Sequence, residues 1–189
     1  MKITSIAFLF LLCAPASAQS VKARPKIEKI AAQISKFDRL DDGAVGFAGE
    51  ETDNYRTFLK LRDQTTPEEL LAFTFDTSAV LKGYASWALV EKGYPGIGGV
   101  FSRFLQSGET VFTLFGCVGG DESLALILYT RVFYVDSVLA RRQFALLDSI
   151  IFAEKNAEGL LTGYALDHNA ELKKELRDLA HSRGLSLKK

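Results

Sequence analysis

Apolar residues recur at helical spacing in several separate segments of the chain. From Pro25 to Leu40 they lie three and four positions apart with lysines between them, which predicts an amphipathic helix. The same spacing returns from Tyr55 to Ser107, where glycine, proline and aspartate divide it into short blocks. We therefore expect a run of short helices joined by tight turns, which is the pattern of an α-solenoid.

The most specific pair of helices is predicted within residues 65–95. Thr66 is followed by a proline and, three positions on, by Glu69, so a capping box can form in which each side chain binds the backbone amide of the other residue. The second helix carries an apolar stripe from Leu81 to Leu89, with small residues that let a neighbouring helix approach closely. The pattern predicts two helices folded back on each other.

The second helix of this pair resembles the second helix of a HEAT-type repeat. HEAT repeats usually read Asp, four residues, Val-Arg, two residues, Ala, two residues and Ala-Leu, and the matching residues here are Asp76, Leu81, Lys82, Ala85, Ala88 and Leu89. The chain departs from the pattern at Leu81, where valine is usual, and at Lys82, where arginine is usual. The resemblance covers one repeat, residues 66–94, and extends to small secreted bacterial proteins with HEAT-like helices and no assigned activity. It implies an α-solenoid segment with a protein-binding surface, and it brings no catalytic residues.

Two segments lack a clear helical period. Residues 41–53 contain three glycines and five carboxylates, so we expect a loop, although the ordered spacing of a calcium-binding loop is missing. Residues 109–117 are rich in β-branched and aromatic side chains, and periodicity leaves both helix and strand open. We favour a helix there, because a lone hairpin would have no sheet to join.

Helical spacing returns over residues 136–152 and 169–183. No linker suggests a second domain, so we expect residues 19–189 to form a single compact domain. The fold class expected is all-α, with HEAT-like helical hairpins stacked into an α-α superhelix.

Residues 1–18 have the features of a secretory signal peptide. Lys2 precedes an apolar run over residues 6–12, and residues 16–18 form a small-residue cleavage motif. We expect the mature chain to be secreted or periplasmic. Membrane insertion after signal removal is not expected, because the apolar run is far shorter than the roughly 20 residues that a membrane span needs.

Composition excludes several partners and scaffolds. Lys and Arg number 23, Asp and Glu number 23, and no basic block appears, so there is no electrostatic basis for binding nucleic acid. Cys117 would be the one cysteine of the mature chain, which rules out an intramolecular disulfide. The G-x-S-x-G, H-E-x-x-H and Walker motifs are absent, and we expect no cofactor.

Cys117 is the candidate nucleophile. It lies among glycines ahead of Asp121, where a helix start could lower the pKa of its thiol, and His168 could act as its base. The alternative is that Cys117 is a small buried residue in a tight turn. With 2 histidines in the whole chain, we expect no metal site.

Tyr84, Trp87 and Lys82 are the candidate binding residues. Tyr84 and Trp87 lie three positions apart on one predicted helix, so they could line a groove that holds a partner's side chain, or pack in the core. We expect a non-catalytic periplasmic module that binds a protein or peptide. The alternatives are a periplasmic immunity or inhibitor protein and a hydrolase that uses Cys117.

Overall fold

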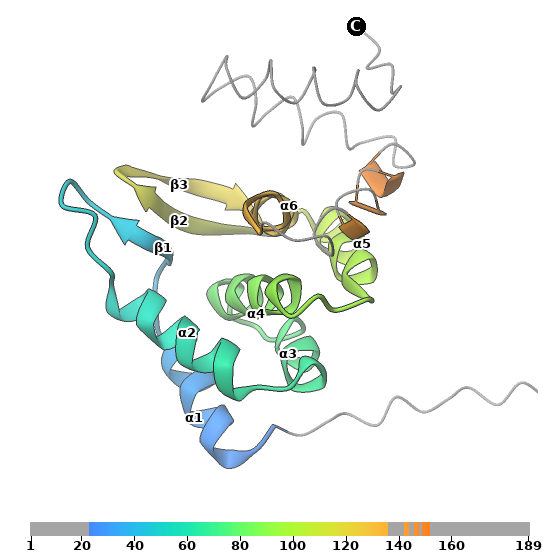
Figure 1. Cartoon of the computed structure of the whole chain (residues 1–189), viewed down its shortest axis with the longest axis horizontal. Helices are drawn as coiled ribbons and strands as arrows, with labels where there is room; N and C mark the ends of the chain where they lie inside the picture. Colours follow the sequence, from blue (N-terminus) through green and yellow to red (C-terminus); the bar gives the residue numbers. More distant parts are fainter. Residues whose placement is uncertain (1–22, 136–141, 144–145, 148, 152–189) are drawn as a thin grey trace, which may run out of the picture.

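The computed structural model of the protein describes residues 23–135, 142–143, 146–147 and 149–151 (Figure 1). The predicted signal peptide at residues 1–18 and the predicted helix at residues 169–183 lie outside them. Within the described residues the fold is mixed, because helices pack against a three-stranded sheet. The expected all-α superhelix is therefore wrong.

Helices form between residues 25 and 107, where apolar spacing predicts them, and the described residues between 142 and 151 are helical as predicted. The helices with defined bounds include one more, after the strands. They are α1 (Pro25–Ile34), α2 (Asp53–Gln64), α3 (Pro67–Phe73), α4 (Ala79–Glu91), α5 (Ile97–Ser107) and α6 (Leu124–Tyr134). The capping box at the start of α3 is confirmed, because Thr66 Oγ1 accepts from the Glu69 amide and Glu69 Oε2 accepts from the Thr66 amide. Ser78 caps α4 by accepting from the Leu81 amide.

The sheet consists of β1 (Leu40–Val45), β2 (Thr110–Gly116) and β3 (Val118–Ser123), in that spatial order. β2 and β3 form an antiparallel hairpin. β1 pairs with β2 in parallel, with Leu40 opposite Thr113. A parallel pair needs a long crossover connection, which α2 to α5 supply.

This pairing corrects two local expectations. The loop expected at residues 41–53 begins as strand β1, and the helix favoured for residues 109–117 is strand β2. The hairpin does have a sheet to join, because β1 pairs with β2 from far upstream in the chain. Two aspartates and a glycine make β1 difficult to recognise from the sequence, because these residues are depleted in strands. Burial of Leu40 and Val45 nevertheless holds it against the core.

Helix α4 lies at the centre of the molecule, between the sheet and the pair α2 and α3 (Figure 1). Residues 83–90 of α4 are all buried, so the helix is enclosed on every side. It packs against α3, α6 and β2. A HEAT repeat would stack its helix pair on further helix pairs. Here the α3–α4 hairpin forms as predicted, but a sheet occupies one of the neighbouring positions.

Candidate functional site

The structure places Tyr84 in the centre of the core. Its hydroxyl donates to the Asp41 carbonyl at 3.0 Å and accepts from the Asp41 amide at 2.8 Å, so it ties α4 to β1. Its ring stacks on Phe58 of α2, with centroids 4.9 Å apart. Burial is the main reason that the pKa of the Tyr84 hydroxyl is raised.

Trp87 is buried one turn further along α4. Its Nε1 donates to the Ile127 carbonyl of α6 at 2.9 Å, and its ring stacks on Phe115 of β2. Tyr84 and Trp87 contact each other edge to face, with centroids 5.8 Å apart. The two predicted binding residues are thus brought together, but in packing contacts between α4 and the surrounding elements.

Lys82, which also lies on α4, forms an ion pair with Glu109. Its Nζ lies 2.7 Å from both carboxylate oxygens of Glu109, just before β2. The side chain is 15% exposed, so this pair is mostly shielded from solvent. Lys82 therefore ties α4 to the start of the hairpin.

Arg131 of α6 lies at the centre of a half-buried group of charged side chains beside Trp87. Its Nε donates to Glu91 Oε1 at 2.9 Å, and its guanidinium carbon lies 4.4 Å from the centre of the Trp87 ring. The other Glu91 oxygen accepts from Arg62 Nη1 at 3.0 Å. Burial alone would lower the pKa of Arg131, but the charge of Glu91 and its hydrogen bond outweigh this and raise it. These pairs join α2, α4 and α6, so we assign them a structural role.

Cys117 is an exposed free thiol in the turn between β2 and β3. The alternative prediction of a buried cysteine is therefore wrong, whereas the predicted tight turn is confirmed. His168, its predicted base, lies outside the described residues, and those residues include no histidine. Within that part of the chain, therefore, no imidazole is available to activate the thiol.

Two adjoining turns form what we call the sheet tip, which consists of residues 46–49 after β1 and residues 116–118 between β2 and β3. The Gly46 amide donates to the Gly116 carbonyl at 2.8 Å, so the turns are joined directly. Gly46 and Gly116 have φ of 71° and 57°, in the left-handed region that favours glycine. Paired backbone bonds between Val45 and Glu50, at 3.0 and 2.9 Å, close the first turn.

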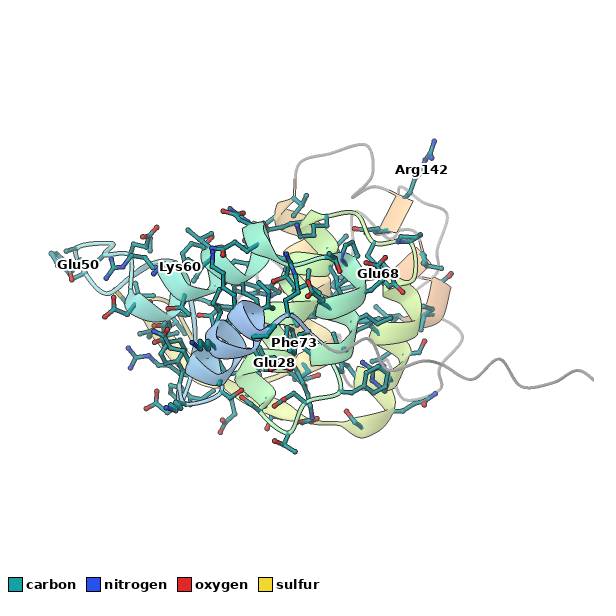
Figure 2. All side chains as sticks on the ribbon, turned by 90° about the horizontal axis from the view of Figure 1, so that it is seen from below. Glu28, Glu50, Lys60, Glu68, Phe73 and Arg142 are labelled. Carbon is teal, nitrogen blue, oxygen red and sulfur yellow. The ribbon has the colours of Figure 1, made fainter. Side chains whose placement is uncertain are left out.

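The sheet tip is apolar and projects from the body of the protein. Phe47 is fully exposed, and Val118 is 61% exposed next to Cys117. Figure 1 shows both turns at the end of the sheet remote from α5, and Figure 2 shows Glu50, at the base of the first turn, at one extremity of the molecule. Sequence reasoning missed Phe47. The usable signal was an aromatic residue within the glycine-flanked segment GFAG.

The residues that the structure describes contain neither a metal-binding group nor a membrane-spanning helix. No group of three or more His, Cys, Asp and Glu side chains is arranged to hold a metal ion among them. In the same residues, no helix combines the length and the apolar character needed to cross a membrane.

No protein family, curated protein or solved structure matches the chain. The resemblance of residues 66–94 to a HEAT repeat therefore has no support beyond the residues that suggested it.

Proposed function

We propose that this protein is a non-catalytic, secreted or periplasmic binding protein that contacts a protein or peptide partner through its sheet tip. The observation that supports the proposal best is the full exposure of Phe47 on a turn whose backbone is hydrogen-bonded to β2. Aromatic side chains supply much of the binding energy at protein interfaces when they enter a partner's pocket.

The construction of the sheet tip favours binding over a role in folding. Phe47 contributes nothing to the core, whereas other aromatic residues such as Phe58 and Phe101 are completely buried. The turn that presents Phe47 is closed by backbone bonds at both ends, so little conformational entropy is lost when a partner binds it. A rigid turn with an apolar summit is suited to enter a pocket rather than to form one.

A hydrolase centred on Cys117 has less support. The thiol is exposed in the turn between β2 and β3, and the described residues provide no imidazole. A nucleophile needs a base within hydrogen-bond reach. We therefore assign Cys117 to the contact surface.

The test is isolation of the complex from extracts of the source organism, followed by affinity measurement with variants. Phe47→Ala should weaken the complex about 10- to 100-fold, because burial of a phenylalanine contributes roughly 1.5–3 kcal/mol and about 1.4 kcal/mol corresponds to a factor of ten. Phe75→Ala is the matched control, since Phe75 is 65% exposed on the α3–α4 turn. If Phe47→Ala left the affinity of the complex unchanged, the proposal would be contradicted.

A further inference from the structure

We propose that the partner presents a basic surface around the apolar pocket that receives Phe47. This inference rests on the proposed function and specifies the chemistry of the partner.

Charge is distributed unevenly along a chain that is neutral as a whole. Residues 40–55 and 104–130 contain the three strands and both turns of the sheet tip. They hold 8 of the 23 Asp and Glu residues and none of the 23 Lys and Arg residues. These segments are therefore acidic in sequence, and Arg39, Arg56, Arg103 and Arg131 directly flank them.

Several of these carboxylates are neutralised by cations from neighbouring segments. Asp41 accepts from Arg39 Nε at 2.8 Å, and Glu109 pairs with Lys82 at 2.7 Å. Asp53 pairs with Arg56 at 2.6 Å. Asp42 lies 3.8 Å from Arg131 and Glu51 lies 4.0 Å from Arg56, so five of the eight carboxylates have a cationic partner.

Two exposed carboxylates of the acidic segments are not neutralised in this way. Glu50 directly follows the turn that carries Phe47, and Asp121 lies on β3 opposite Phe112. Both are exposed, and neither forms an ion pair with any residue that the structure describes. Unpaired negative charge is thus present at the base of the Phe47 turn, at Glu50, and further along the sheet on β3, at Asp121.

An apolar centre with a charged border resembles the division of protein interfaces into an apolar core and a polar rim. A basic rim on the partner would attract this border and speed association, whereas an acidic partner would be repelled. Nucleic acids and anionic lipid surfaces carry the wrong sign of charge. A cationic protein or peptide with apolar side chains is the partner that satisfies both features.

The test uses the full mature chain and two labelled synthetic peptides, one an amphipathic helix of Lys and Leu and the other its counterpart with Glu in place of Lys. Binding is measured by fluorescence anisotropy. We expect saturable binding of the Lys peptide and little binding of the Glu peptide. Raising the salt concentration from about 50 to about 300 mM should weaken the complex, since exposed charges are screened.

Charge reversal at Glu50 and Asp121 provides the decisive comparison. Glu50→Lys with Asp121→Lys should weaken binding of the Lys peptide by about tenfold or more. The control, Glu28→Lys with Glu68→Lys, makes the same change in net charge on α1 and α3, away from Glu50 in Figure 2, and should leave binding unchanged. Thermal unfolding of each variant verifies that it is folded.

The outcomes separate the inference from the function on which it rests. If both peptides bind equally and Phe47→Ala weakens both, the partner is not basic, but the sheet tip still binds. If neither peptide binds, or if Phe47→Ala leaves the affinity for the Lys peptide unchanged, both proposals fail. The chain could instead associate with itself, and Phe47→Ala could abolish this association. The partner would then be a second copy of the chain, and the inference would be overturned.

Discussion

Glu69 shows how one side chain can join two helix starts. It is almost completely buried, and its carboxylate accepts hydrogen bonds from the Arg24 amide, the Arg24 guanidinium and the Thr66 amide. The hydrogen bond from the Arg24 side chain is the largest cause of a pKa lowered to about 2. The carboxylate therefore connects the start of α1 to the start of α3, and its stabilising effect depends on its negative charge.

This arrangement predicts the pH dependence of stability. Because the folded-state pKa of Glu69 lies below its ordinary value, the ionised group stabilises the fold at neutral pH, and this contribution is lost as pH falls from about 5 towards about 2. Glu69→Gln should lower the free energy of unfolding at pH 7, and the difference from the wild type should shrink across that interval. The measurement is urea unfolding at a series of pH values.

The neighbouring Glu68 offers a matched control for this experiment. It is exposed in the first turn of α3, so Glu68→Gln should change the free energy of unfolding only slightly at any pH. A constant difference between Glu69→Gln and the wild type from pH 7 to pH 2 would mean that the charge of Glu69 is not what stabilises the fold.

At the scale of elements, the close packing of α4 depends on Gly83. A Cβ atom at this position would lie 2.5 Å from Leu40 Cδ1 of β1 and 2.9 Å from Ile127 Cδ1 of α6. Both neighbours are buried and have little room to move. The glycine thus lets the central helix approach the sheet and α6 together.

Gly83→Ala should therefore destabilise the protein by about 1–3 kcal/mol, because overpacking outweighs the usual preference for alanine in helices. Gly99→Ala is the control: Gly99 lies in α5, and a Cβ atom there meets nothing within 4 Å. That change should stabilise the protein by about 0.5–1 kcal/mol. Thermal unfolding measures both variants, and equal effects of the two changes would contradict the packing described here.

Local sequence signals predicted the elements better than their assembly. The capping box of Thr66 and Glu69 located the start of α3, because both partners lie within one turn of chain. Strand β1 was missed, because its partner β2 is remote in sequence and its aspartates and glycine resemble a loop. Without β1, the hairpin of β2 and β3 could not be recognised as part of a sheet.

The candidate site was predictable only in part. The glycines around Cys117 pointed to an unusual turn, and the structure places that turn in the sheet tip. Phe47 lies in the glycine-flanked segment GFAG, but its full exposure in the sheet tip depends on the fold, because β1 pairs with a strand that is remote in sequence. Tyr84 and Trp87 are aromatic residues of the kind that is common in binding sites. Long-range packing nevertheless encloses α4, so both side chains are buried in the core.

At the scale of the whole molecule, the functional account depends on the parallel pairing of β1 and β2, which joins the two turns of the sheet tip. Nuclear Overhauser effects between backbone protons of the folded protein test this pairing directly. We expect them between residues 40–41 and 113–114, and between Gly46 and Gly116, in the register of the structure. Absence of these cross-strand effects, or helical medium-range effects across residues 110–116, would contradict both the sheet and the contact surface built on it.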